Sequence, residues 1–210
     1  MPIRTILYGG AFDMPHIGHK NMATQTLRFM SKVSGYKELW FLPRSSDTLG
    51  IKKPVADNHR VAMLEIMTKE MLNSPLFSVC TDELEMTSRA GTYAVVKELI
   101  RNYPERKFCY LMGSDQAKSI RSWRNSRKLI MTIPCVVVQR AGISNWNHNY
   151  WYYRAPHTYI DGKPTKTPMS SSAIRHDFNN NWDKLKADRH IHLLRNIHKY
   201  IVKNKLYQEA

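Results

Sequence analysis

The stretch YGGAFDMPHIGHK, residues 8–20, places two glycines directly after an apolar run and two histidines just beyond them. Residues 4–8 (RTILY) predict a short strand, and residues 19–33 show the apolar spacing of a helix. Glycine lets backbone N–H groups come close to a ligand, and a helix N-terminus attracts anions. We therefore interpret this strand–glycine–helix turn as a site for the phosphates of a nucleotide.

The two histidines of this stretch make the interpretation more specific. His16 and His19 are three residues apart, so both can point from the start of a helix towards one phosphate group. A metal pair is the alternative, and it needs a third ligand, for which Asp13 is the only nearby candidate. Packing of the two rings within the fold is the third interpretation, and the spacing leaves all three open.

The length and composition indicate an ordinary globular protein. A chain of 210 residues suits a single domain, 1–210, and we expect a C-terminal substructure from about residue 170. No stretch approaches the roughly 18 consecutive apolar residues of a membrane span, and the N-terminal apolar run is too short for a signal peptide. We expect a cytoplasmic protein that is not associated with a membrane.

The charge balance is strongly basic. Lys and Arg number 32 against 17 Asp and Glu, which gives a formal net charge of +15. Such a surface attracts nucleic acid, acidic membranes or small phosphorylated substrates. The densest basic group, expected to form a solvated helix face, comprises Lys184, Lys186, Arg189, Arg195, Lys199, Lys203 and Lys205. The three cysteines, which we expect to be buried free thiols, are Cys80, Cys109 and Cys135.

Predicted strands and helices alternate along the chain. The strands are expected at residues 4–8, 38–43, 77–84, 107–113 and 133–140. The helices are expected at residues 19–33, 58–72, 92–103, 122–129 and 188–204. In the first helix, the apolar positions are Met22, Leu27, Met30 and Val33. This alternation indicates an α/β fold, a Rossmann-like doubly wound parallel sheet of about five to six strands with a small helical C-terminal part.

Ligands of a parallel sheet bind at the carboxyl ends of its strands. The segments expected there are Gly9–Gly10, Pro43–Arg44, Gly113–Asp115 and Gln139–Arg140. Residues 141–169 interrupt the alternation with aromatic and turn-forming residues, and we expect an irregular excursion. The aromatic stretch 146–153 suits a lid, a subunit contact or an internally packed excursion, and the sequence leaves these open.

Two motifs resemble those of a known superfamily. The pattern Gly-x-Phe-Asp-x-x-His-x-Gly-His at residues 10–19 resembles the opening motif of nucleotidyltransferases, with Met14 in place of the usual proline. The segment MSSSAIR, residues 169–175, resembles the second motif of the same superfamily. The motifs occur in the expected order, and we expect them to meet in space around one triphosphate chain.

Within this superfamily the chain most resembles nicotinamide/nicotinate mononucleotide adenylyltransferases, over nearly its whole length. The segments that carry this likeness are FLP with Lys52 and Lys53, then NHRVAML, LMGSDQAKSIRSWRNSRKLI and IHKYIVKNKLY. The segment TYAVVKEL departs from the family's pattern, because Ala94 and Val95 replace its usual Asp and Thr.

The resemblance implies a reaction of ATP with a pyridine mononucleotide, giving NAD or deamido-NAD and pyrophosphate by direct in-line attack. The attacking 5′-phosphate has a second pKa of about 6 and is mostly a dianion at pH 7, so it needs no general base. Catalysis is then expected to rest on positioning and on electrostatic stabilisation.

The resemblance also implies a role for each matching residue. Catalytic roles fall to His16, His19 and Arg175. ATP-binding roles fall to Gly9, Gly10, Phe12, Lys53 (or Lys52), Gly113, Asp115, Ser171 and Ser172. Mononucleotide-binding roles fall to Trp123, Thr92 and Arg140, with Trp123 stacking on the pyridine ring. Mg²⁺ is the expected cofactor, bound mainly through the ATP phosphates and water rather than by a protein metal site.

Several of these residues also have a purely structural interpretation. Ser170–Ser172 suit a helix N-cap, Asp115 suits a helix cap, Trp123 suits the core, and Arg140 suits a strand end. His190 and His192 have the spacing of a metal pair, but on a basic helix we expect them to be surface residues.

Two other functions compete with the leading one. One is another adenylyltransferase of the superfamily, such as the phosphopantetheine type. The other is a basic nucleic-acid-binding protein that has kept the fold, which the charge of +15 supports. The expected partners are ATP and the pyridine mononucleotide, and both nucleic-acid binding and a homo-oligomer are left open.

Overall fold

The computed structural model describes residues 1–45, 54–86, 91–139, 150–161 and 170–208. Its strands form one six-stranded sheet with the order β3-β2-β1-β4-β5-β6, and every neighbouring pair is parallel. The strands are β1 (Ile3–Gly10), β2 (Glu38–Pro43), β3 (Phe77–Val79), β4 (Arg106–Gly113), β5 (Cys135–Val138) and β6 (Thr158–Ile160). The predicted Rossmann-like doubly wound fold is confirmed.

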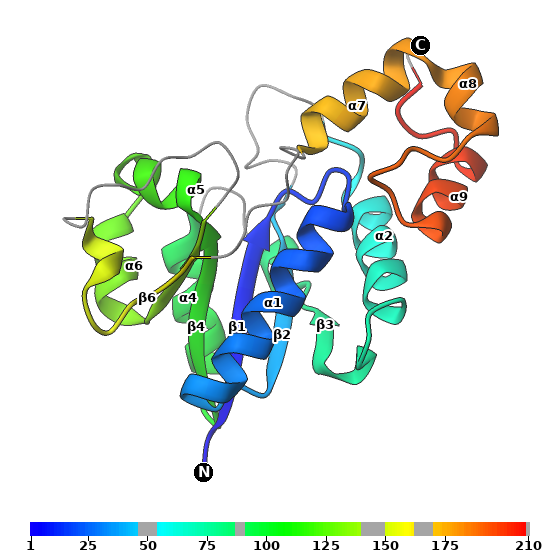
Figure 1. The fold of residues 1–210 in the computed structure, drawn as a ribbon. Coiled ribbons are helices and arrows are strands. Elements are labelled where there is room, and N and C mark those ends of the chain that lie inside the picture. Colours follow the sequence, from blue (N-terminus) through cyan, green and yellow to red (C-terminus); the bar gives the residue numbers. More distant parts are fainter. Residues whose placement is uncertain (46–53, 87–90, 140–149, 162–169, 209–210) are drawn as a thin grey trace.

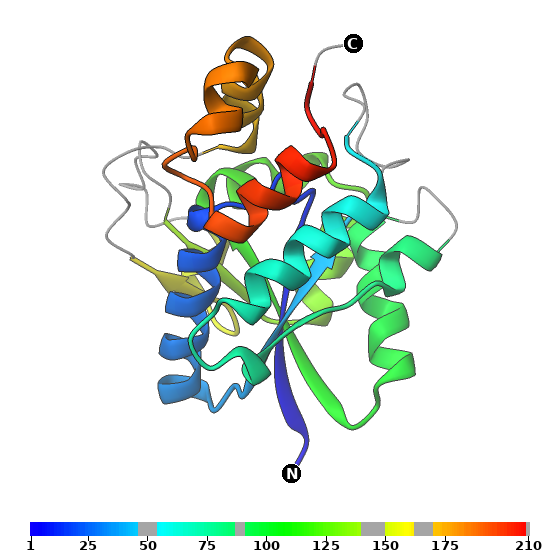
Figure 2. The same cartoon turned by 90° about the vertical axis from the view of Figure 1, so that its right-hand side faces the viewer.

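Helices cover both faces of the sheet. They are α1 (Ile17–Ser34), α2 (Asp57–Lys69), α3 (Asp82–Glu85), α4 (Gly91–Asn102), α5 (Ser114–Ser119), α6 (Ser126–Thr132), α7 (Ser171–Asn180), α8 (Trp182–Ala187) and α9 (Arg195–Lys203). Figures 1 and 2 show α1 and α4 on opposite sides of the sheet and α7, α8 and α9 beyond the carboxyl ends of the strands.

The central strand β1 supplies side chains to two separate cores. Ile6 and Tyr8 pack with α1 and α2, whereas Leu7 packs on the other face with α4, α5 and α6. This follows from the two-residue period of a strand, which points successive side chains to opposite faces. The buried residues of α1 are Ala23, Thr26, Leu27 and Met30. Val33, another apolar position of this helix, is 57% exposed in its last turn.

The C-terminal helices share the first core. Ile197 and Ile201 of α9 are fully buried and belong to the same cluster as Ile6. The predicted helix over 188–204 is wrong in its first part, because α9 begins only at Arg195 and a non-helical segment precedes it. His190 in that segment is 8% exposed and its Nε2 lies 3.1 Å from an Asp177 carboxylate oxygen, so the expected surface position is also wrong.

Three further differences concern element boundaries. The strand predicted at 77–84 ends at Val79. The Cys80 N–H still donates to the Phe41 carbonyl of β2 at 2.9 Å, and Asp82–Glu85 then form a helical turn. The helix predicted at 122–129 lies instead at Ser126–Thr132. The short helices α5 and α8 and the strand β6 were not predicted, since elements of three to six residues show too little periodicity to be recognised.

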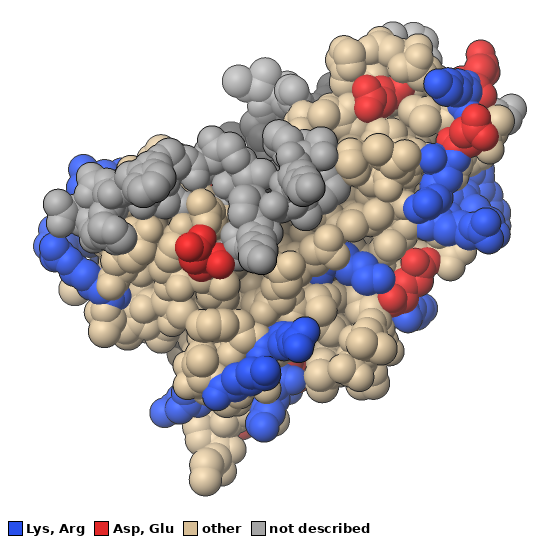
Figure 3. All heavy atoms as spheres, viewed as in Figure 1, with Lys and Arg blue, Asp and Glu red and all other residues tan. Residues whose placement is uncertain are grey.

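Basic side chains are spread over the surface. Of the densest basic group, those described as exposed, as expected, are Lys184, Arg189, Arg195, Lys199, Lys203 and Lys205. The side chain of Lys186 lies outside the described part. Figure 3 shows Lys and Arg along the flank formed by α8 and α9 and again over the lower end of α1, with Asp and Glu among those of the flank.

The three cysteines are buried and free, which confirms the prediction. Burial raises the pKa of the Cys80 and Cys109 thiols to about 12, so both stay protonated at neutral pH. Among the described helices, none is both long enough and apolar enough to cross a membrane.

Candidate functional site

The first motif forms the turn between β1 and α1 at the carboxyl edge of the sheet. Gly9 is the last but one residue of β1, and a Cβ at this position would lie 1.9 Å from the hydroxyl oxygen of Tyr110 in β4. A Cβ on Gly10 would lie 3.0 Å from the Phe12 ring. Glycine at position 9 is therefore required by the close approach of a buried tyrosine from the neighbouring strand.

His16 and His19 form the N-terminal cap of α1. The His16 Nδ1 accepts a hydrogen bond from the Gly18 N–H at 3.0 Å, and the His19 Nδ1 accepts one from the His16 N–H at 3.3 Å. The ring centroids are 3.9 Å apart, and the Phe12 ring lies edge-on to His19 at 5.1 Å. Because both Nδ1 atoms accept, the proton of each neutral ring is on Nε2, which makes Nε2 the nitrogen able to donate.

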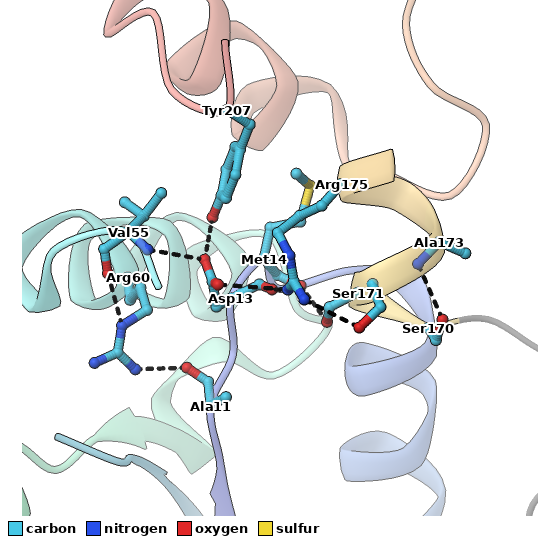
Figure 4. Close-up of polar contacts among 11 residues, drawn as sticks. Ala11, Asp13, Met14, Val55, Arg60, Ser170, Ser171, Ala173, Arg175 and Tyr207 are labelled. Carbon is cyan, nitrogen blue, oxygen red and sulfur yellow. Dashed lines mark hydrogen bonds and ion pairs between the residues drawn. The ribbon is translucent and has the colours of Figure 1, made fainter. Parts of the chain in front are cut away.

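The second motif lies directly against the first. The Ser171 hydroxyl donates to the Met14 carbonyl at 3.0 Å, across 157 residues of chain. Arg175 Nη1 donates to the Asp13 carbonyl and lies 3.4 Å from the Asp13 carboxylate (Figure 4). The two motifs therefore meet in space, as their resemblance to the two nucleotidyltransferase motifs led us to expect.

The serines of the second motif have distinct positions. Ser170 is the N-cap of α7, and its side chain accepts from the Ala173 N–H at 3.1 Å, so the capping interpretation is right for this serine. The Ser172 hydroxyl accepts from Arg175 Nη2 at 3.0 Å. Ser171 and Ser172 thus occupy the first turn of a ten-residue helix whose N-terminus faces the first motif.

The Asp13 side chain joins the first motif to three distant segments of the chain. It is 6% exposed, and its carboxylate accepts from the Val55 N–H at 3.3 Å and from the Tyr207 hydroxyl at 2.6 Å, in addition to its contact with Arg175 (Figure 4). The described part of the chain contains no group of three His, Cys, Asp or Glu side chains placed to hold a metal ion. Asp13 is therefore directed at protein donors from three distant segments.

Arg60 is a residue whose role the sequence analysis missed. Its side chain is fully buried and donates to the carbonyls of Val55, Ala11 and Arg44 at 3.1, 2.6 and 2.7 Å, and it pairs with the Asp57 carboxylate. A signal was present, because Arg60 shares a helical face with the buried residues Met63, Leu64 and Met67. A charged residue in such a stripe indicates a buried, hydrogen-bonded cation.

Two of the residues predicted to bind the mononucleotide, Trp123 and Thr92, lie beside Tyr110. Trp123 is half-buried and lies edge-on to the Tyr110 ring at 6.3 Å, and Thr92 hydrogen-bonds the Tyr110 side chain. Glu83, which was not predicted, is 8% exposed in the same region, and burial raises its pKa to about 7 despite the nearby Arg44 and Arg60. Trp123 and Thr92 thus both interact with Tyr110, and Trp123 also packs partly on the core.

The remaining predicted residues are divided between described and undescribed parts. Gly113 ends β4 at the N-cap of α5, and Asp115 lies in the first turn of that helix. Lys52, Lys53 and Arg140 lie outside the described residues. Of the aromatic stretch, residues 150–153 are described: Tyr152 is fully buried and Trp151 Nε1 donates to the Ala117 carbonyl at 3.2 Å, so this part is packed internally.

Comparisons with known proteins agree with this geometry. Residues 7–177 match the family described as cytidylyltransferase-like. A protein of Exiguobacterium sibiricum named "Probable nicotinate-nucleotide adenylyltransferase" is 33% identical over 136 residues, 65% of this chain and 68% of its own length. One of the same name from Bacillus cytotoxicus is 26% identical over 203 residues, 96% of this chain and 97% of its own.

Solved structures show the same fold. Plasmodium falciparum nicotinic acid mononucleotide adenylyltransferase, complexed with APC and complexed with NaAD, matches this chain with TM-scores of 0.76 and 0.75 at 20% identity. Each match covers 98% of this chain and 97% of that chain.

Proposed function

Because this chain belongs to the cytidylyltransferase-like family, we propose that it transfers the adenylyl group of ATP to nicotinate mononucleotide, forming deamido-NAD and pyrophosphate. The chain is a nucleotidyltransferase. The observation that carries the proposal is the contact of the two motifs, the Ser171 hydroxyl on the Met14 carbonyl at 3.0 Å, which places two helix N-termini beside one another. Two such termini suit the several charges of a triphosphate.

The reaction needs alignment more than proton transfer. An oxygen of the mononucleotide's 5′-phosphate forms a bond to the α-phosphorus of ATP, and the bond from that phosphorus to the bridging oxygen of pyrophosphate breaks. The nucleophile is already a dianion, so no side chain has to remove a proton from it. The work of the protein is to hold two anions in line and to balance the charge that develops.

We assign that charge balance to His16 and His19. Their Nδ1 atoms are acceptors in the cap of α1, so each Nε2 is the donor that the helix start presents. Donors held in this way do not have to reorganise when negative charge grows on the transferring phosphate, which is the basis of electrostatic catalysis. Gly9 and Gly10 are proposed to bring the backbone close to the nucleotide beside this helix start, while the space that a Cβ would fill is taken by Tyr110 at Gly9 and by Phe12 at Gly10.

The β- and γ-phosphates are assigned to Ser171, Ser172 and Arg175 at the start of α7. Arg175 supports this because its guanidinium spans from Asp13 to Ser172, at the boundary between the motifs. Lys53, in the segment after β2, is proposed to neutralise further phosphate charge. Phe12 is buried and lies edge-on to His19. We propose that it holds the His19 imidazole in place as well as contacting ATP.

The rest of the substrate is assigned to the other strand ends. Gly113 and Asp115 are proposed to face the adenosine ribose, and Trp123, Thr92 and Arg140 the pyridine mononucleotide. We propose the acid form of the mononucleotide as the preferred one, since the relatives are named for nicotinate nucleotide. We also propose that residues 1–210 act as a single domain, because the C-terminal helices share the core of the sheet.

Mg²⁺ is proposed to enter with ATP. The described residues offer no cluster of metal-binding side chains, and the Asp13 carboxylate accepts bonds from protein donors. The cation would therefore be bound by phosphate oxygens and water, where it neutralises charge on the leaving pyrophosphate. No step is assigned to a protein-bound metal.

The direct test is a comparison of acceptors. Pyrophosphate release and dinucleotide formation are measured with ATP and nicotinate mononucleotide, nicotinamide mononucleotide or phosphopantetheine. We expect the highest kcat/KM with nicotinate mononucleotide and no product with phosphopantetheine. Preference for phosphopantetheine, or no product with either pyridine nucleotide, would refute the proposal.

The His19→Ala variant tests the assigned chemistry. Removing one charge-stabilising donor from a pre-formed site lowers kcat by about 10²–10³. Circular dichroism and the unfolding midpoint should stay close to wild type, because the bond that His19 contributes to the cap is a single long one. Turnover equal to wild type would show that His19 does not touch the transferring phosphate.

A further inference from the structure

The C-terminal end of the chain reaches the first motif. Tyr207 lies four residues beyond α9, and its hydroxyl donates to the Asp13 carboxylate at 2.6 Å, across 194 residues (Figure 4). Burial raises the pKa of this phenol, which keeps it protonated and therefore a donor at all ordinary pH values. This is a short hydrogen bond to a charged group, which is stronger than one between neutral partners.

Asp13 transmits this contact to both motifs. Its backbone belongs to the turn three residues before His16, and its carbonyl and carboxylate both contact Arg175. The same carboxylate oxygen that accepts from Tyr207 also accepts from the Val55 N–H. The position of the Asp13 side chain is thus set jointly by Val55, Arg175 and Tyr207, which follow it in the sequence by 42, 162 and 194 residues.

A second contact joins Tyr207 to the second motif. In the amide orientation that satisfies both of its ends, Asn179 donates to the Tyr207 carbonyl at 2.8 Å and to the Arg175 carbonyl at 3.3 Å. Tyr207 therefore contacts the turn between β1 and α1 through its hydroxyl, and it contacts α7, the helix of Arg175, through its backbone carbonyl. A residue in this position can set the distance between the two motifs.

We propose that Tyr207 is a positioning residue for adenylyl transfer: its hydroxyl orients Asp13 and thereby holds the turn of His16 and His19 in register with Arg175. This inference rests on the proposed function. Reacting groups that are displaced by a fraction of an ångström to one ångström lose much of their catalytic effect, even when the substrate still binds. The contribution of Tyr207 should therefore be found mainly in kcat.

The chain offers a matched control on the same C-terminal segment. The Tyr200 hydroxyl lies 2.9 Å from His59 Nδ1, so it joins α9 to α2, and within the described residues it has no hydrogen bond to either motif. Tyr200→Phe and Tyr207→Phe each remove one hydroxyl and one hydrogen bond between the C-terminal segment and the rest of the protein. If the role of Tyr207 were merely structural, the two variants would have the same kcat.

We expect Tyr207→Phe to lower kcat about tenfold, the loss typical of one hydrogen bond to a charged group. The KM for the mononucleotide should stay within about twofold. Tyr200→Phe should leave kcat within about twofold of wild type. Both variants should lower the unfolding midpoint, and Tyr207→Phe should lower it more, because its hydrogen bond is to a charged group. Equal kcat values for the two variants would overturn the proposal.

A second readout does not depend on turnover. The imidazole NMR signals of His16 and His19, assigned with His→Ala variants, should shift in Tyr207→Phe and stay unchanged in Tyr200→Phe. If the wild-type protein showed no adenylyl transfer, the proposed function would be refuted. Shifted His16 and His19 signals in Tyr207→Phe would even then show that Tyr207 positions the turn that carries the two histidines. Unchanged signals in Tyr207→Phe would show that it does not.

Discussion

Glu83 is a carboxyl group in a position where burial opposes its ionisation. Its side chain is almost fully buried, and desolvation raises its pKa from 4.5 to about 7. Arg44 and Arg60 act in the opposite direction and lower the pKa, but desolvation is the larger effect. The carboxylate also acts on Tyr110 and Cys80, whose pKa values it helps to raise. At neutral pH this group is therefore close to half-protonated.

The pH dependence of stability follows from this shift. The folded state holds the Glu83 proton more tightly than the unfolded state, so the contribution is fully present below pH 4.5 and is lost as the pH rises through about 7. We expect Glu83→Gln to remove this loss, which is of the order of 3 kcal/mol for a shift of this size. Urea unfolding at pH 5 and pH 8 measures it.

The matched control for this prediction is Glu85→Gln. Glu85 lies in the same short helix but is exposed, so its replacement should leave the pH dependence as in wild type. If wild type and Glu83→Gln lose the same unfolding free energy between the two pH values, Glu83 does not titrate in this range.

One buried side chain of the helix α2 binds the irregular backbone at the carboxyl edge of the sheet. Arg60 donates to carbonyls in the turn after β1, in the segment after β2 and in the segment before α2 itself. Each of these carbonyls belongs to irregular backbone at the carboxyl edge of the sheet, where no strand partner is available to it. A single guanidinium with five donors can satisfy such a set, which a lysine cannot.

Arg60→Met should therefore be strongly destabilising. The substitution removes the guanidinium donors from the Asp57 carboxylate and from the buried carbonyls. Removing one partner of a buried ion pair typically lowers the free energy of unfolding by about 3–5 kcal/mol. The control is Arg101→Met on α4, an exposed arginine paired with Glu98, which should cost less than about 1 kcal/mol. Denaturant unfolding compares the two, and equal losses would mean that the Arg60 contacts add nothing to stability.

Elements of the fold differ in how far they could be predicted. The long elements β1, α1, α2, α4 and β4 carry clear apolar periodicity, and the structure has each of them within a few residues of its expected bounds. The segment 188–204 was misjudged because its first residues are polar and basic, a pattern shared by solvated helices and loops. His190 in that segment packs on Phe178 of α7, a contact that no local pattern indicates.

The charge of the whole molecule is larger than its substrates require. A net charge of +15 creates a positive field around the protein, and the basic residues are spread over several surfaces rather than collected in one (Figure 3). Such a field increases the rate at which anionic ligands arrive, and salt screens it over about 10 Å at 0.1 M ionic strength. We therefore attribute to the excess charge an effect on substrate capture.

Salt should accordingly act on capture more than on turnover. Between about 0.05 and 0.5 M salt, kcat/KM for ATP should fall several-fold while kcat changes little. Steady-state kinetics at constant free Mg²⁺ measures both, and a kcat/KM that is independent of salt would contradict the expectation. In the same salt series, tight binding of a labelled oligonucleotide with a steep salt dependence would support the alternative of nucleic-acid binding.

Local sequence was enough to predict the parallel α/β sheet and the two motifs, because strand and helix periodicity and the Gly-His and Ser-Arg patterns are properties of neighbouring residues. Local sequence could not predict the partners of Asp13. Val55, Arg175 and Tyr207 lie up to 194 residues from Asp13. The Val55 N–H and the side chains of Arg175 and Tyr207 reach the Asp13 carboxylate only when α2, α7 and the C-terminal segment pack on the carboxyl edge of the sheet. The same is true of Arg60 and Glu83, because burial of a charged group depends on what surrounds it in space.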